Sequence, residues 1–165
     1  MNRLWIALRA TVYAAIFLAL WAGVALACRA LDKYIPLQVP GWSMVSGVVL
    51  FLAGAALGLT TIGLFIFEGL GTPAVFDPPK KFVPKGPYRL VRNPMYVGGV
   101  SMLFGLGLYL ASVSMVIFAF VAILLIHTFV VLAEEPGLRK RFGKEYEDYC
   151  RTVPRWIPRV TNRHP

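Results

Sequence analysis

The chain has 165 residues, of which 58% are apolar and 15% are charged, with a formal net charge of +9. Soluble domains contain nearer ~45–50% apolar residues, so the composition excludes an ordinary soluble protein and predicts one all-α integral membrane domain over residues 1–165. The basic residues flank apolar segments, which favours orientation in a lipid bilayer over binding of nucleic acid. Cys28 and Cys150 fall on opposite sides of the membrane in the topology predicted below, and neither has a C-x-x-C neighbour, so neither a disulfide nor a zinc site is expected.

Residues 1–67 contain the first two of about four predicted transmembrane helices, Trp5–Ala27 and Met44–Phe67. Each is about as long as the ~20 residues that cross the hydrocarbon core. The first apolar run is too long for a signal-peptide core and has no convincing cleavage site, so we expect a retained helix. Small residues on the second helix permit close helix contacts, either within the chain or between chains.

Residues 68–165 contain a predicted loop, a helix hairpin and a cytoplasmic tail. The connector Glu68–Asn93 is rich in proline and glycine, which predicts an irregular loop against the membrane face. Two further apolar segments, Tyr96–Leu110 and Met115–Ala133, are separated by only four residues, which predicts a tight antiparallel helix hairpin. Glycines on its first helix would let the hairpin backbones approach closely, namely Gly98, Gly99, Gly105 and Gly107.

The tail Gly137–Tyr149 carries apolar and aromatic residues every three to four positions on an otherwise charged segment, which predicts a helix in the membrane interface. Positive charge decides the orientation, since Arg29 and Lys33 are the only basic residues on one side. The basic residues of the other side are Arg3, Arg9, Lys80, Lys81, Lys85, Arg89, Arg92 and those from Arg139 to Arg163. We therefore expect both termini in the cytoplasm, and the inner membrane as the location in a bacterium.

Three polar groups converge at the cytoplasmic end of the predicted hairpin, namely residues 85–89, residues 92–96 and the pair Glu134-Glu135. Two glutamates beside a membrane span can be a solvated terminus. The helix dipole disfavours negative charge at this end, however, so a cation such as Arg92 or a bound ligand is expected beside them. Arg92 and Glu135 are therefore the candidate catalytic residues.

His127 lies about two turns inside the last predicted helix. Polar residues at membrane depth are functional candidates by default. A hydrogen bond to a neighbouring helix would explain the histidine equally well.

The segment Gly86–Gly98 is followed by Glu134–Leu138, Phe142-Gly143, Tyr146, Tyr149 and Val153-Pro154. In this order the motifs resemble the isoprenylcysteine carboxyl methyltransferase family and its bacterial and phospholipid-methyltransferase relatives, over roughly Lys80 to Pro158. The resemblance implies a membrane methyltransferase that binds S-adenosyl-L-methionine at the cytoplasmic end of the hairpin without a Rossmann domain. It also implies cofactor-binding roles for Lys80, Lys81, Phe82, Val83, Tyr88, Asn93, Pro94, Met95, Tyr96 and Glu134.

Two positions depart from the family pattern. Asn93 stands where the family usually has histidine, and Val130 stands where the carboxyl methyltransferases have an arginine that holds the acceptor's carboxylate. We therefore expect an amphipathic or lipid-like acceptor whose reactive end is neutral or able to lose a proton, such as an amine or a thiol. The candidate substrate residues are His127, Val130 and Arg151; Arg92 and Arg155 could also reach the acceptor.

Two other functions stay open at this point. Tyr149-Cys150 and Val153-Pro154 are also similar to the C-terminal region of membrane sterol reductases that use NADPH, although those proteins are much longer. A membrane scaffold without catalysis, which keeps only the shape of the fold, is the third hypothesis.

Overall fold

The structure is a computed structural model, and it describes residues 3–69, 72 and 80–159. All regular structure in these residues is helical, as predicted. In chain order the elements are α1 (Arg3–Arg29), η1 (Asp32–Tyr34), α2 (Ser43–Leu64), η2 (Phe65–Gly69), η3 (Gly86–Arg89), α3 (Pro94–Tyr109), α4 (Val113–Phe129), η4 (Val130–Glu134), α5 (Glu135–Phe142) and α6 (Lys144–Thr152).

Three helical segments of the described chain are long and apolar enough to cross a membrane, namely Leu4–Tyr34, Ser43–Gly69 and Val113–Phe142. The third predicted span, Tyr96–Leu110, forms α3, whose 16 residues measure about 24 Å along the axis, less than the ~30 Å hydrocarbon core. α3 begins two residues before the predicted start because Pro94 suits the first helical position. The long helices leave large apolar side chains exposed, as a lipid-facing surface requires, among them Leu20, Leu52 and Leu124.

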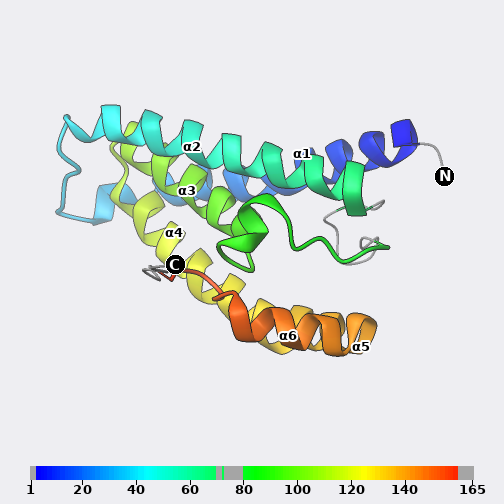
Figure 1. Cartoon of the computed structure of the whole chain (residues 1–165). Coiled ribbons are helices and arrows are strands. Elements are labelled where there is room, and N and C mark those ends of the chain that lie inside the picture. The colour runs from blue at the N-terminus through cyan, green and yellow to red at the C-terminus, as the bar shows by residue number, and fades with distance from the viewer. Residues whose placement is uncertain (1–2, 70–71, 73–79, 160–165) are drawn as a thin grey trace, which may run out of the picture.

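Figure 1 shows α2 and α3 side by side, with α1 behind them, whereas α4 runs away from this group toward α5 and α6. The end of α2, the start of α3 and the end of α4 lie at one end of the molecule. The short connections between α1 and α2 and between α3 and α4 lie at the other end. The predicted polar groups of residues 85–96 and 134–135 therefore share one end of the fold.

The contact between α2 and α3 is a seam of paired glycines. A Cβ atom built on Gly54 would lie 2.5 Å from the carbonyl oxygen of Gly98, and one on Gly105 would lie 2.6 Å from that of Gly47. Both helices space these glycines seven residues apart, so the pairs recur every two turns. The two backbones touch directly, which is a common way to pack helices in a membrane.

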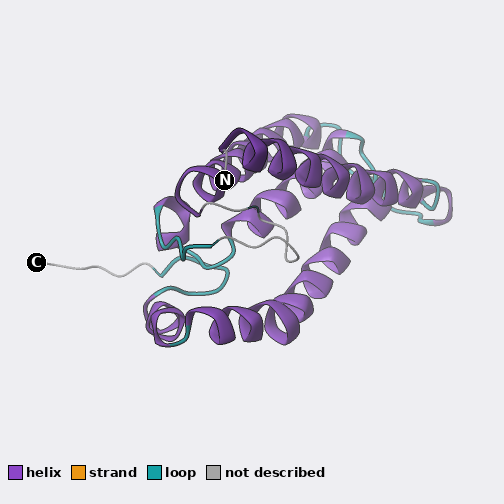
Figure 2. Cartoon of the chain, turned by 90° about the vertical axis from the view of Figure 1, so that its right-hand side faces the viewer, coloured by secondary structure: helices purple, strands orange, loops and turns teal. Residues whose placement is uncertain are grey.

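The prediction that Gly98 and Gly105 bring α3 close to α4 is wrong, because both face α2. Gly107 alone of the four hairpin glycines packs on α4, where a Cβ would lie 3.1 Å from the backbone nitrogen of Val116. A Cβ on Gly99 would meet nothing within 4 Å. The hairpin therefore exists, but α4 diverges from α3 beyond its first turns (Figure 2).

Two polar contacts hold the start of α4 in place. Ser112 is its N-cap, and the serine hydroxyl accepts a 3.3 Å hydrogen bond from the backbone N–H of Met115. Asp32 of η1 accepts a 2.8 Å hydrogen bond from the backbone N–H of Ser114 and a second bond from the Ser114 hydroxyl. The connection between the helices is shorter than predicted, because α4 already begins at Val113.

The tail is two short helices, α5 and α6, rather than one. The break falls at Gly143, whose φ of 52° is a conformation that favours glycine. The predicted apolar stripe, Leu138, Phe142, Tyr146 and Tyr149, packs with Phe82 and Val153 in one small core. This face of the tail is therefore buried against the loop that follows residue 80.

Candidate functional site

The first turn of α3 and the end of η4 meet through Tyr96 and Glu134. The Tyr96 hydroxyl donates a 2.7 Å hydrogen bond to Oε2 of Glu134. No other hydrogen bond or ion pair joins Glu134 to the residues that the structure describes. The half-buried carboxylate thus has a neutral donor beside it but no cation.

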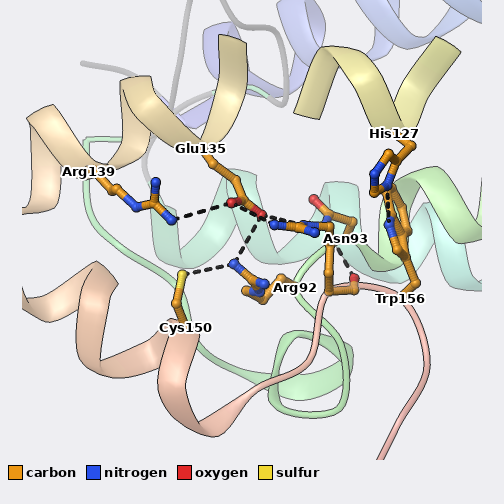
Figure 3. Close-up of polar contacts among 8 residues, drawn as sticks. Arg92, Asn93, His127, Glu135, Arg139, Cys150 and Trp156 are labelled. Carbon is orange, nitrogen blue, oxygen red and sulfur yellow. Dashed lines mark hydrogen bonds and ion pairs between the residues drawn. The ribbon is translucent and has the colours of Figure 1, made fainter. Parts of the chain in front are cut away.

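Glu135, the adjacent residue, has the opposite environment (Figure 3). Its side chain is 3% exposed and is surrounded by three arginines from three segments. Arg155 contacts both carboxylate oxygens, at 2.7 Å and 3.1 Å, Arg92 lies at 3.0 Å and Arg139 at 3.6 Å. The hydrogen bond to Glu135 raises the pKa of Arg155 above its ordinary value.

The helix conformation explains why two neighbouring glutamates have different partners. Residues Val130–Glu134 form a π-helical turn, and α5 begins at Glu135. A π-turn inserted in an α-helix shifts the direction of the side chains that follow, and such turns are frequent at functional sites. The sequence contains no simple signal for this turn, so the separate directions of Glu134 and Glu135 were not predictable.

Arg92 connects the ion cluster to α6. Its Nη1 atom donates to the carboxylate of Glu135 and also lies 2.9 Å from Sγ of Cys150. Its Nε atom is buried and has no hydrogen-bond partner in the described part of the protein. Arg92 therefore lies beside the predicted pair, as expected, but it contacts Glu135 rather than Glu134.

The segment 153–156 lies across the ends of α3 and α4. The backbone N–H of Arg92 donates to the carbonyl oxygen of Pro154 at 2.9 Å, and Nδ2 of Asn93 donates to that of Arg155 at 3.2 Å. At the far end, Nε1 of Trp156 donates to Nδ1 of His127 at 3.0 Å (Figure 3). We call this segment the C-terminal strap.

Tyr88 holds the loop before α3 against α6. Its carbonyl oxygen accepts a 2.6 Å hydrogen bond from the hydroxyl of Tyr149, and its ring packs edge-on against Phe65. Burial raises the pKa of both tyrosines above the ordinary value, so they remain neutral donors. Tyr88 therefore has a fixed position at the end of the fold that carries Glu134 and Glu135.

The predicted loop residues 80–83 divide into two kinds. Lys80 and Lys81 are exposed, and their backbone N–H groups donate to the carbonyl oxygen of Gly69. Val83 is buried, and the ring of Phe82 packs against three aromatic rings of the tail with centroids 5.0–5.9 Å away. Phe82 thus fixes the loop to α5 and α6.

The structure brings most predicted site residues together at one end of the fold. These are Tyr88, Arg92, Asn93, Pro94, Met95, Tyr96, Glu134 and Glu135, and Trp156 joins His127 to them. Val130 is fully buried at the start of η4. Arg151 lies apart from the group, because its side chain is 76% exposed and pairs with Asp148 at 3.3 Å.

Sequence reasoning missed Arg139, Cys150 and Trp156 as neighbours of the site and gave Arg155 only a secondary role. A buried carboxylate needs cationic partners, so arginines could be expected beside Glu135. The sequence did not indicate which arginines these are. Within residues 3–69, 72 and 80–159, no group of three or more histidine, cysteine or acidic side chains is placed to hold a metal ion.

Two curated proteins are similar to half of this chain. The nickel-cobalt-cadmium resistance protein NccN of Alcaligenes xylosoxydans xylosoxydans is 31% identical over 81 residues, which are 49% of this chain and 38% of that protein. The cobalt-zinc-cadmium resistance protein CzcN of Cupriavidus metallidurans is 32% identical over 79 residues, 48% of this chain and 36% of that protein. The chain therefore aligns with less than two thirds of either relative.

The family model for phospholipid methyltransferases matches residues 42–145. The match includes α2, the glycine seam, the loop before α3, the hairpin and both glutamates. It confirms the resemblance seen in the motifs, and the chain belongs to the phospholipid methyltransferase family, a family of membrane methyltransferases.

Proposed function

We propose that this protein transfers the methyl group of S-adenosyl-L-methionine to an amphipathic or lipid-like acceptor at the cytoplasmic face of a membrane. In a bacterium this would be the inner membrane, with both chain termini in the cytoplasm. Family membership supports a membrane methyltransferase, and the excess of basic residues at the end that carries the site supports the orientation.

The observation that carries the proposal is the contrast between two adjacent carboxylates. Glu135 has three arginines around it, whereas among the described residues Glu134 has only the hydroxyl of Tyr96. A carboxylate that is shielded from water without a cation costs free energy, and a cationic ligand would remove that cost. S-adenosyl-L-methionine carries an ammonium and a sulfonium, so the unpaired Glu134 suits this cofactor.

The neighbours of Glu134 have matching chemistry. Tyr96 holds the carboxylate of Glu134 in place, and the ring of Tyr88 lies at the same end of the fold. Tyrosine rings can face an adenine or a cation. Asn93, Pro94 and Met95 place the start of α3 beside them, and residues 80–83 would cover the cofactor from the loop.

Transfer of the methyl group requires little acid–base chemistry, because the sulfonium already activates the methyl carbon. The protein's task is to hold the acceptor in line with it at near-attack distance and to exclude water. The ion cluster around Glu135 fixes the loop, α5 and the C-terminal strap around Glu134 and so performs this positioning.

The surroundings of Glu134 favour an acceptor whose reactive end is neutral or can lose a proton. Arg92 and Arg155 already contact Glu135, and Arg151 points to solvent. Position 130 is the buried, apolar Val130. An amine or a thiol therefore suits the site better than a carboxylate, and the exposed apolar side chains of α4 favour a lipid-like acceptor.

The proposal is tested by ligand-dependent stabilisation of the purified protein in detergent. S-adenosylhomocysteine should raise the unfolding temperature, and NADPH should leave it unchanged. Stabilisation by NADPH alone would indicate a reductase, and the absence of stabilisation by either ligand would favour a scaffold. Transfer of radiolabel from S-adenosyl-L-methionine to added lipid then identifies the acceptor.

A further inference from the structure

His127 lies on the outer surface of α4, among apolar side chains that a bilayer would cover. Leu124 and Phe129 beside it are exposed, and the helix belongs to the segment Val113–Phe142, which is long and apolar enough to cross a membrane. The neighbouring Thr128 is also exposed, but its hydroxyl donates a 2.9 Å hydrogen bond to the carbonyl oxygen of Leu124 in the same helix. The hydrogen bond of His127, by contrast, goes to a residue outside the helix.

The hydrogen bond with Trp156 fixes which ring nitrogen of His127 carries the proton. An indole nitrogen only donates, and Nε1 of Trp156 lies 3.0 Å from Nδ1 of His127 (Figure 3). Nδ1 is therefore the acceptor and carries no proton, so the imidazole is neutral and has its N–H at Nε2. That N–H has no hydrogen-bond partner within the part of the chain that the structure describes. The histidine thus offers one donor to whatever covers this surface.

The position of His127 along the helix decides which lipid atoms can reach this donor. His127 precedes Glu135 of the ion cluster by eight residues, or about 10–12 Å along the axis. Even at a tilt of about 40° this is roughly 8 Å of depth, whereas the headgroup layer on each side of a bilayer is about 5–7 Å thick. His127 therefore lies at the edge of the hydrocarbon core. The lipid oxygens at this level are the ester carbonyls that join the acyl chains to glycerol.

The end of the C-terminal strap adds apolar surface beside the donor. Trp156 is half-buried, and Ile157, the next residue, is 79% exposed. Tryptophan is enriched at membrane interfaces, because its ring is apolar while its N–H needs a polar partner. An N–H donor and two apolar side chains thus lie close together where the strap meets α4.

We infer that a bilayer lipid binds at this place as a structural ligand. The ester carbonyl oxygen of a glycerolipid accepts a hydrogen bond from Nε2 of His127, and the acyl chain lies against Trp156 and Ile157. Arg155, the residue before Trp156, contacts Glu135, so a lipid that secures this end of the strap also supports the ion cluster. His127 is then a lipid-binding residue, and Trp156 is a positioning residue that fixes its tautomer.

The test compares two lipids that differ only in the ester. Diacyl phosphatidylethanolamine has the carbonyl oxygens, and its dialkyl ether analogue keeps the same headgroup and chain length without them. Lipid titration of the purified full chain in detergent, followed by native mass spectrometry, measures both affinities. The wild-type protein should bind the ester lipid about two- to tenfold more tightly, the value of one neutral hydrogen bond. Equal affinities would overturn the inference, and if both then fell in His127→Phe, the histidine would bind the phosphate instead.

Two substitutions on α4 locate the preference. His127→Phe keeps an aromatic ring and loses the donor, so the preference for the ester lipid should disappear. Thr128→Val is the matched control, since Thr128 is exposed next to it and its hydroxyl is bonded within the helix, and it should keep the preference. A preference that persists in His127→Phe would overturn the assignment.

The role of Trp156 is tested by the protonation pattern of the histidine ring. Nitrogen NMR of protein with labelled histidine should show the proton of His127 on Nε2, and Trp156→Phe should give a mixture of the two tautomers. A proton on Nδ1 in the wild-type protein would contradict the inference. None of these measurements contains S-adenosyl-L-methionine, so they can fail while the proposed function holds, and the proposed function can fail while they succeed.

Discussion

The hydroxyl of Tyr96 donates a 2.7 Å hydrogen bond to the carboxylate of Glu134 and so joins the first turn of α3 to the end of η4. Some 38 residues separate the two in sequence. The hairpin alone would bring them to the same end of the fold. The direct contact also depends on the π-helical turn, which directs Glu134 and Glu135 toward different partners.

Glu134→Gln should weaken binding of S-adenosylhomocysteine by about ten- to a hundredfold, since a charge-assisted hydrogen bond contributes about 1.5–3 kcal/mol. The same change should not destabilise the ligand-free protein, because the carboxylate has no cationic partner among the described residues. Calorimetry measures the first effect and thermal unfolding the second. An unchanged affinity would make Glu134 a plain helix terminus.

Glu135→Gln should instead destabilise the fold, on the order of 3 kcal/mol, because it leaves the mostly buried Arg92 without its counter-charge. Thermal unfolding in detergent measures the loss. Arg151→Gln is the matched control, since its ion pair with Asp148 is exposed and should contribute little. Similar unfolding temperatures for the two variants would argue against a buried ion cluster.

The glycine seam predicts that Gly105→Ala disrupts packing, because the new Cβ would lie 2.6 Å from the backbones of Gly47 and Phe51. Gly99→Ala introduces the same methyl group on the same helix without any atom within 4 Å. It should be neutral or slightly stabilising, since alanine favours helix by up to about 1 kcal/mol. The test compares the unfolding temperatures of the two variants. Equal values would contradict the direct backbone contact between α2 and α3 at the glycine seam.

The acceptor is tested by incubating the protein with radiolabelled S-adenosyl-L-methionine and either a farnesylcysteine analogue or a panel of amine and thiol lipids. We expect methylation only of amines or thiols, because the buried position 130 is valine. Val130→Arg should not improve turnover on them. Base-labile methyl esters on farnesylcysteine would show instead that one of the other arginines binds the acceptor's carboxylate.

Orientation in the membrane is tested with reporters of sidedness. A reporter fused after Pro165 should read cytoplasmic, and one inserted near Gln38 should read external, because basic residues gather at the first of these ends. The opposite pair of readings would separate the site from the cytosolic supply of S-adenosyl-L-methionine and so contradict the proposed function.

The sequence was sufficient to predict the four long apolar helices, because long apolar runs and the prolines between them leave few alternatives in a bilayer. It also placed Arg92, Tyr96 and Glu134 at one end of a hairpin. It did not reveal which helix the glycines of α3 face, since Gly98 and Gly105 fit a partner on either side. Only the three-dimensional structure shows that Gly98 and Gly105 contact Gly54 and Gly47 of α2.

The arginine partners of Glu135 were only partly predictable for a related reason. Many basic residues follow Glu135 in the chain, and orientation in the membrane already explains them. Arg155 reaches Glu135 because Pro154 and the Arg155 carbonyl are hydrogen-bonded to the start of α3. Such long-range backbone contacts leave no periodic signal in the sequence.

The backbone contact between α2 and α3 divides the molecule into parts of unequal stiffness. No side chains lie between the paired glycines that could change rotamer, so these two helices should move as one body. The first part of α4 packs in a buried cluster with α1 and α3 as far as Ala122, and the other end of the helix is joined to them through the ion cluster. We therefore expect only the part of α4 beyond Ala122 to move when the ion cluster loosens, which would widen the route by which a lipid-like acceptor enters from the bilayer.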